Sequence, residues 1–255
     1  MVIVILTALG VGGATLLGTL IGFIFKNISH KFSDIILSFA AGVMLAAAVF
    51  GLIISSVETG GKFGVLYAVI GILLGAICLN LMDKLVPHLH KLSGAELEDH
   101  GDRNKLNKVL LFVFAIAIHN FPEGLAAGVS FGGVPVGGDA THAIVIAGGI
   151  ALQNIPEGMV IIGPMLAAGL SKKRAFIYAL ITGLVEVLGT FIGYFAASIS
   201  AVVLPLLLAF AGGTMLYVIS DEMIPETHAH GSQRGATYTL LIGFCLMLVF
   251  DVLIG

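Results

Sequence analysis

Charged residues are scarce in this chain of 255 residues, because Asp, Glu, Lys and Arg make up only 11% of it. An ordinary soluble domain is about one-quarter charged. Hydrophobic side chains make up 58% of the sequence, and the mean hydropathy is +1.09. This composition excludes a water-soluble globular protein. No polar stretch is long enough to form a soluble second domain, so we expect one transmembrane domain that covers residues 1–255.

The sequence also has few cysteines and no basic patch. Its two cysteines, Cys78 and Cys245, lie far apart in apolar runs, which argues against a disulfide framework or a zinc knuckle. We expect both side chains to face lipid or to pack between helices. The formal net charge is -3, and no Lys/Arg patch is interleaved with aromatic residues. The pattern therefore predicts no nucleic-acid partner.

Apolar stretches recur along the whole chain, and about 20 apolar residues suffice for a helix to cross the hydrocarbon core. We place eight spans at Val2–Phe25, Ile35–Ser56, Phe63–Leu85, Val109–Val129, His142–Leu166, Ala175–Ala197, Val202–Ile219 and Thr237–Gly255. They predict an all-α, polytopic membrane helical bundle. The first span lacks the basic start of a signal peptide and exceeds its usual apolar run of roughly 7–15 residues. We therefore interpret it as a membrane helix.

Basic residues predict how the bundle is oriented, because Lys and Arg collect in cytoplasmic loops. If the N-terminus lies outside, all of the 12 Lys and Arg residues except Lys62 fall on the cytoplasmic side. Losing or adding one span would scatter them over both sides. Both termini are therefore predicted to lie outside.

One predicted cytoplasmic loop, residues 87–107, is rich in polar side chains. It contains three histidines and four acidic residues, namely His88, His90, Glu96, Glu98, Asp99, His100 and Asp102. Such a loop has two interpretations. Its charges simply keep it in water, or its histidines and carboxylates capture or sense a metal ion weakly.

Two spans contain near-copies of one unusual segment. His-Asn-Phe-Pro-Glu-Gly begins at His119 in the fourth span, and Gln-Asn-Ile-Pro-Glu-Gly begins at Gln153 in the fifth. The first residue and the glutamate are four positions apart in each, so a helix of about 3.6 residues per turn places them on one face. His119 then lies over Glu123, and Gln153 lies over Glu157. Each pair is suited to chelate one ion.

Each of these segments also places a proline inside its span. Pro122 and Pro156 cannot donate a backbone hydrogen bond, and each clashes with the carbonyl group four residues earlier. We expect a kink in both helices. Non-helical backbone at membrane depth is tolerated where it lines a cavity or is buried in protein. The two prolines therefore favour an internal site.

The carboxylates of Glu123, Glu157 and Glu186 lie within apolar spans. His119, Gln153 and Glu186 are each near the middle of a span, so we expect the set to meet near the bilayer midplane. An ionised side chain there costs about 2.5–3.5 kcal/mol, and no Lys or Arg lies in these three spans. The compensating charge must come from protons or a bound cation. Ligands of the His, Glu, Asn and Gln types suit zinc, iron(II) or manganese.

With these motifs, the chain resembles the ZIP family of metal transporters, and its bacterial GufA-like branch in particular. The resemblance covers the whole chain, and the paired Asn-x-Pro-Glu-Gly motifs are its most specific part. It implies a homodimeric bundle with a 3+2+3 helix arrangement that moves metal into the cytoplasm by an elevator-like shift. It also implies a metal site that contains His119, Asn120, Glu123, Gln153, Asn154, Glu157 and Glu186, with Met44 at its edge.

Two positions depart from patterns that are common in the family. Many members have His where this chain has Gln153, and some members with two metal ions have Asp where it has Asn154. Both changes remove affinity or charge, so they favour one bound ion over two. A carboxamide in place of an imidazole also makes the site harder, so iron(II), manganese or cadmium are expected to compete with zinc.

The two alternatives differ in their ligands. A single ion is expected to bind His119, Glu123, Gln153 and Glu157. In the two-ion alternative, Glu123 and Glu157 bridge to a second ion whose other ligands are Asn120, Asn154 and Glu186. The sequence favours the first arrangement.

Polar residues near the ends of the spans are candidates for the path on either side of the site. Residues 221–230 contain three carboxylates and two histidines, and they resemble a segment that the family places at the inner exit. A solvated helix end is the alternative. Outside, Glu58 and Asp251 are suited to attract cations, although Asp251 is also interpretable as an interfacial charge. Asp34 begins the second span, and we interpret it as an N-cap.

The sequence therefore predicts a multi-pass protein of the cell membrane that transports divalent metal ions, zinc foremost, into the cytoplasm by alternating access. No resident cofactor is expected, and the expected partners are the metal ion, the lipid bilayer and a second copy of the chain. A membrane-embedded metalloenzyme is the alternative. Di-iron bundles repeat Glu-x-x-His on two helices. In the two segments of this chain, His119 is the only histidine that can act as a ligand, and it lies four positions before its glutamate. A sensor is disfavoured because the chain has no output domain.

Overall fold

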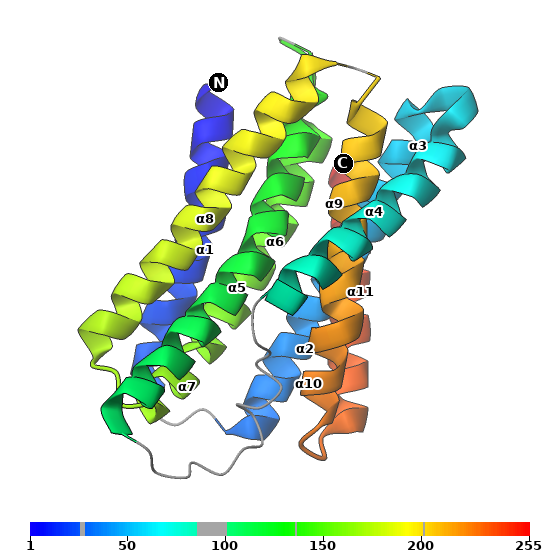
Figure 1. The fold of residues 1–255 in the computed structure, drawn as a ribbon. Coiled ribbons are helices and arrows are strands. Elements are labelled where there is room, and N and C mark those ends of the chain that lie inside the picture. Colours follow the sequence, from blue (N-terminus) through cyan, green and yellow to red (C-terminus); the bar gives the residue numbers. More distant parts are fainter. Residues whose placement is uncertain (26–28, 86–100, 136, 201) are drawn as a thin grey trace.

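The computed structural model describes residues 1–25, 29–85, 101–135, 137–200 and 202–255, and these residues form helices and no strands. The long helices are α1 (Val2–Ile24), α2 (His30–Ala46), α4 (Gly64–Leu85), α5 (Gly101–Gly132), α6 (Thr141–Val160), α8 (Lys172–Ile199), α9 (Leu204–Val218) and α11 (Gln233–Ile254). Consecutive long helices run in opposite directions, so both chain ends lie at the same end of the bundle (Figure 1). The predicted all-α fold is confirmed.

Short helical pieces extend three of the long helices. They are α3 (Ser55–Thr59), α7 (Ile162–Ala167) and α10 (Ile224–His228). Two π-helical segments, η1 (Ala47–Ile54) and η4 (Ile219–Met223), join α2 to α3 and α9 to α10. A π-helical turn is wider than an α-helical turn and occurs frequently at functional sites. Hydrophobic periodicity did not predict either segment.

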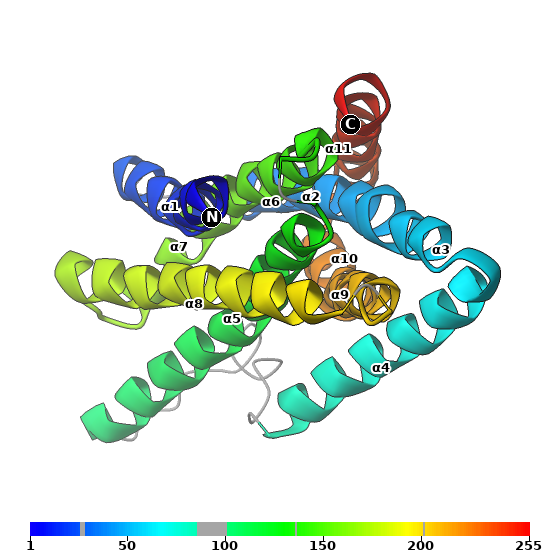
Figure 2. The same cartoon turned by 90° about the horizontal axis from the view of Figure 1, so that it is seen from above.

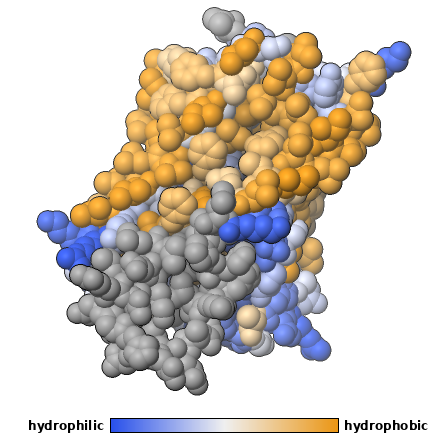
Figure 3. All heavy atoms as spheres, viewed as in Figure 1, coloured by the Kyte–Doolittle hydropathy of each residue, from blue (hydrophilic) through white to orange (hydrophobic). Residues whose placement is uncertain are grey.

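The predicted spans all fall on helices. Seven helical stretches in the described part of the chain are long and apolar enough to cross a membrane, and Val109–Val129 lies within α5. Apolar residues cover most of the face shown in Figure 3, and hydrophilic residues gather mainly toward its lower end. Cys78 and Cys245 are both free thiols, as predicted.

The polar loop is shorter than predicted. Helix α5 begins at Gly101, so residues 101–107 are helical and not part of a loop. Polar composition is compatible with either a loop or a helix end, so it did not show where the helix begins. The remainder of the predicted loop, residues 87–100, lies outside the described residues.

The long helices form two groups (Figure 2). In the first group, which we call the four-helix unit, α5 packs mainly on α8, and α1 packs on α6 and α8. In the second group, α2 packs mainly on α11 and α4 packs on α9. The two groups meet where α2 contacts α6 and where α5 contacts α9. Most residues of the predicted site lie on the four-helix unit.

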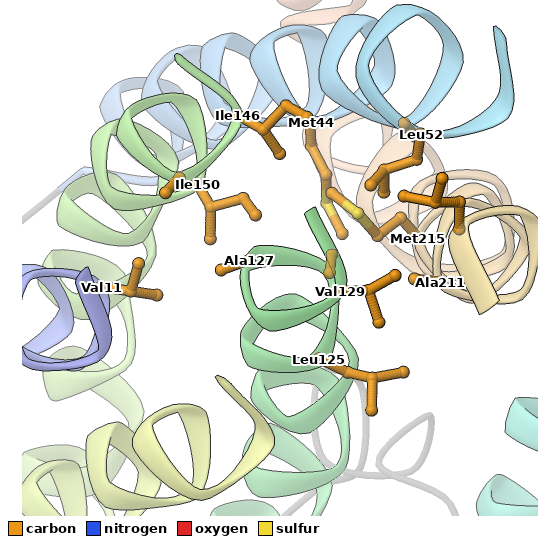
Figure 4. Packing of buried hydrophobic residues seen from close by; sticks show 14 of the residues in the cluster. Val11, Met44, Leu52, Leu125, Ala127, Val129, Ile146, Ile150, Ala211 and Met215 are labelled. Carbon is orange, nitrogen blue, oxygen red and sulfur yellow. The ribbon is translucent and has the colours of Figure 1, made fainter. Parts of the chain in front are cut away.

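An apolar cluster fills the space between the two groups (Figure 4). Its members include Met44, Leu52, Val129, Ile146 and Met215, each at most 1% exposed, and we call these five residues the apolar plug. Val129 lies six residues beyond Glu123 on α5, which is about 9 Å along a helix axis. The plug therefore lies on one side of the predicted site, toward the end of the bundle that holds both termini.

Asp34 is not the N-cap of α2, so that prediction was wrong. Ser29 is the cap, because its Oγ accepts a hydrogen bond from the Phe32 N–H at 3.3 Å. Asp34 lies inside the helix and is buried, with its Oδ1 3.0 Å from Nδ1 of His230. The helix begins about one turn earlier than the apolar pattern suggested, since its first turn is polar.

Candidate metal site

The two similar segments lie in the interiors of α5 and α6, which contact each other. Both helices continue through their prolines, Pro122 and Pro156. The first residue and the glutamate of each segment therefore keep the spacing that places them on one helix face. The predicted site residues on these helices are His119, Asn120, Glu123, Gln153, Asn154 and Glu157.

The glycine that ends each segment allows a close helix contact. A Cβ atom on Gly124 would collide with the backbone oxygen of Glu186 on α8. A Cβ atom on Gly158 would collide with the backbone oxygen of Thr15 on α1. Small residues let helix backbones approach in this way. The two glycines thus bring Glu186 and Thr15 next to the two segments.

Glu186 is fully buried and accepts hydrogen bonds from three side chains. Its Oε1 accepts one from the Thr15 hydroxyl group at 2.6 Å and one from Nδ2 of Asn120. Its Oε2 accepts one from Nδ2 of Asn154 at 2.6 Å. We call these four residues the Glu186 network. It ties together all four helices of the four-helix unit.

Other polar atoms of the two segments are buried without a hydrogen-bond partner. They are Oε2 of Glu123, Oε1 of Gln153, Oδ1 of Asn154 and Oε1 of Glu157. A buried polar atom that lacks a partner costs about 1–3 kcal/mol. Carboxylate and amide oxygen atoms are donors of the kind that bind divalent cations.

The charges of the site are also uncompensated. The carboxylates of Glu123, Glu157 and Glu186 lie close enough to repel one another, and His119 lies near Glu157. Within the described part of the chain, no Lys or Arg forms an ion pair with any of the three carboxylates. A cation is therefore the species that the arrangement is suited to accept.

His119 points toward the second helix group. Its Nε2 lies 2.8 Å from Oε1 of Glu222, and the two side chains are 17% and 27% exposed. Glu222 belongs to the π-helical segment η4. Among the described residues, no three His, Cys, Asp or Glu side chains already surround one point. An ion that binds His119 together with the glutamates must therefore compete with Glu222 for the imidazole.

Comparison with known proteins decides the family. The model of the ZIP zinc transporter family matches residues 94–251. The chain is 42% identical to the zinc transporter GufA of Myxococcus xanthus, over 96% of each chain. It is 36% identical to the zinc transporter ZIPB of Bordetella bronchiseptica, over 95% of this chain and 78% of that protein.

The chain belongs to the ZIP family. It is also 31% identical to the human zinc transporter ZIP11, over 95% of this chain and 94% of that protein. The predicted resemblance to GufA is thus confirmed. ZIP proteins are transporters, so this chain is not an enzyme, and the metalloenzyme alternative is wrong. The family and the seven apolar helical stretches identify a multi-pass protein of the cell membrane.

The described structure of this ZIP protein brings most of the predicted site residues together. Met44 is fully buried in the apolar plug with Met215, and its place at the edge of the site stays a prediction. Two residues of the site were missed, namely Thr15 and Glu222. Thr15 is a common residue in an apolar span, and Glu222 was one of several acidic residues in a predicted exit segment. Neither carries a local signal, because their roles depend on contacts between distant helices.

Three polar residues of this ZIP protein lie away from the site, toward the end of the bundle that holds both termini. Nε2 of His142, at the start of α6, lies 3.5 Å from Oδ1 of Asp251 near the end of α11. Glu58, on α3, is exposed. Both acids lie at the end of the bundle that holds the termini (Figure 1), where the sequence predicted them. Their role in attracting cations stays a prediction.

Proposed function

We propose that this ZIP protein carries divalent transition-metal ions, zinc foremost, across the cell membrane into the cytoplasm. The observation that supports it most strongly is the set of unpartnered oxygen atoms on Glu123, Gln153, Asn154 and Glu157, buried beside uncompensated carboxylates. The relatives named above are zinc transporters. Carboxylate, carboxamide and imidazole ligands also bind iron(II), manganese and cadmium, which are therefore secondary substrates.

The site binds one metal ion at a time. The ligands of this ion are His119, Glu123, Gln153 and Glu157. These side chains come from the same two helices and include two carboxylates, which match the charge of a divalent cation. Oδ1 of Asn154 is a further oxygen without a partner at the same place. Met44 borders the site only from within the apolar plug.

Transport proceeds by alternating access, and the described conformation corresponds to the one closed to the outside. The apolar plug fills the space between the helix groups on the outer side of the site. On the inner side, the partly exposed pair of His119 and Glu222 borders water. The assignment of outer and inner sides rests on the basic residues, of which all but Lys62 fall at the inner end if both termini lie outside.

Release of the ion to the cytoplasm uses the same pair. When the imidazole of His119 pairs with Glu222 in place of the ion, the ion loses its nitrogen ligand and is bound more weakly. Zinc in particular loses affinity, because imidazole is one of its preferred ligands. We also propose that the protein forms a homodimer, as the family resemblance implies.

The test is uptake of zinc by purified protein in liposomes, with Glu157→Gln as the variant. Glu58→Gln is the matched control, because it removes an exposed carboxylate far from the site. We expect uptake to be lost in the first variant and kept in the second. Wild-type uptake should also weaken as the pH falls, since carboxylate ligands must be deprotonated to bind. Equal uptake by the wild type and Glu157→Gln would contradict the proposed site.

A further inference from the structure

We propose that Thr15 and Glu186 are positioning residues of the metal site and that neither coordinates the ion. This inference rests on the proposed function, since it assigns roles within the same site. It concerns a buried carboxylate that the sequence placed among the metal ligands and a threonine that the sequence did not single out.

The first step is the lone-pair count of the Glu186 carboxylate. An ionised carboxylate has about four acceptor positions and no donor. Thr15 and Asn120 occupy two positions on Oε1, and Asn154 occupies one on Oε2. The three side chains that hydrogen-bond to the group all act as donors, so three of its about four acceptor positions are occupied without a metal ion.

The second step is the orientation of the two amides. Only the nitrogen of an amide donates, so Nδ2 of Asn120 and of Asn154 must face Glu186. Oδ1 of Asn154 then points elsewhere, and it is one of the buried oxygen atoms without a partner. Glu186 therefore sets which end of the Asn154 amide faces the ion.

The third step is the position of Thr15. It is 2% exposed on α1, and its backbone oxygen is the atom against which Gly158 packs. The same oxygen accepts a hydrogen bond from the hydroxyl group of Thr19 at 3.0 Å. Thr15 is thus fixed at both its backbone and its side chain, and it holds Glu186 in the direction of Asn120 and Asn154.

The consequence is a division of labour among the three glutamates. Glu123 and Glu157 each have a buried oxygen without a hydrogen-bond partner. These two carboxylates therefore bind the ion and release it. Glu186 keeps its three donors in both conditions. With Glu186 occupied in this way, no ligand set for a second ion remains, and the site holds one ion per protomer.

The experiment counts zinc ions on purified protein by equilibrium dialysis. A variant with both Glu123→Gln and Glu157→Gln serves as the blank, so that zinc bound elsewhere is subtracted. We expect one ion for the wild type and still one for Glu186→Gln, with affinity weakened by about tenfold, as is typical when a partner of a ligand is removed. Two ions in the wild type, or loss of an ion in Glu186→Gln, would overturn the inference. No ion above the blank in the wild type would instead contradict the proposed function.

A pair of Thr15 variants tests the positioning role without removing a charge. Thr15→Val keeps the shape and removes the donor, whereas Thr15→Ser keeps the donor. In liposome uptake, Thr15→Val should raise the half-saturating zinc concentration by about tenfold, the lower end of the range known for residues that support metal ligands. Its maximal rate per folded protein should stay the same, and Thr15→Ser should behave as the wild type. A lower maximal rate with unchanged half-saturation, or no rescue by Ser, would contradict the inference.

Discussion

The segments that begin at His119 and Gln153 share most of their sequence but differ in their surroundings. In both, the asparagine donates to Glu186 and the glycine packs against the backbone of a neighbouring helix. The first residues differ. His119 is partly exposed and paired with Glu222, whereas Gln153 is fully buried and its amide oxygen has no hydrogen-bond partner.

The direction of the two helices explains this difference. Helices α5 and α6 are antiparallel (Figure 1), so the first residue of a segment lies toward opposite ends of the bundle in the two helices. His119 lies on the side of η4, which the proposed orientation places toward the cytoplasm, and Gln153 lies on the side of the apolar plug. A nearly identical motif therefore places one proposed ligand at the partly exposed edge of the site and one in its buried part.

The largest expected effect comes from changing what the two segments share. Glu123→Ala and Glu157→Ala each delete an anionic ligand, and zinc uptake should fall by at least about 100-fold, as when one partner of a buried charge pair is removed. The check is uptake in liposomes at equal amounts of folded protein. If one variant transports normally while the other does not, the two glutamates are not equivalent ligands.

The next effect comes from making the first segment like the second. His119→Gln removes the nitrogen ligand and the contact to Glu222, so zinc affinity should fall by about 10- to 100-fold. Manganese uptake should fall less, because this ion prefers oxygen ligands. Concentration-dependent uptake of both ions measures this difference. Equal losses for the two ions would show that His119 does not coordinate them.

The reverse change makes the second segment like the first. Gln153→His should raise the affinity for zinc by about tenfold relative to manganese, because imidazole suits zinc better than a carboxamide oxygen does. Tighter binding slows release, so the maximal rate should fall while the half-saturating concentration falls too. An unchanged ratio of zinc to manganese affinity would mean that residue 153 is not a ligand.

A smaller effect is expected at the residue that distinguishes the inner mouth. Glu222→Gln keeps the size of the side chain but removes the charge that competes for His119. Ion release should slow, so the maximal uptake rate should fall by about three- to tenfold, which corresponds to roughly 0.7–1.4 kcal/mol. The half-saturating concentration should not rise. Glu226→Gln is the control, because Glu226 is exposed on the next turn.

The smallest effect is expected for the polar loop that the sequence predicts. Deletion of residues 88–100 should leave zinc uptake within about twofold of the wild type, because the polar path lies in the helix bundle and charged residues in water contribute little to the site. Complete loss of uptake in a correctly inserted protein would make this loop part of the transport path.

Much of the site was predictable because its signals are local. The spacing of His119 and Glu123, or of Gln153 and Glu157, follows from helix geometry alone. The cost of unpaired carboxylates in apolar spans predicted a cation. The cap of the second span was less predictable, because it depends on where a polar first turn starts: Ser29 caps the helix, and Asp34 lies inside it.

The sequence by itself determined the helices, their number and the two ligand segments, since hydrophobic length and i, i+4 spacing act within one helix. Only the tertiary structure decided that the first residues of the two segments lie toward opposite ends of the bundle, that Thr15 and two asparagines surround Glu186, and that Glu222 reaches His119. These contacts join residues up to 171 positions apart in the chain. They arise from the close packing of antiparallel helices, a property that no single segment of the sequence contains.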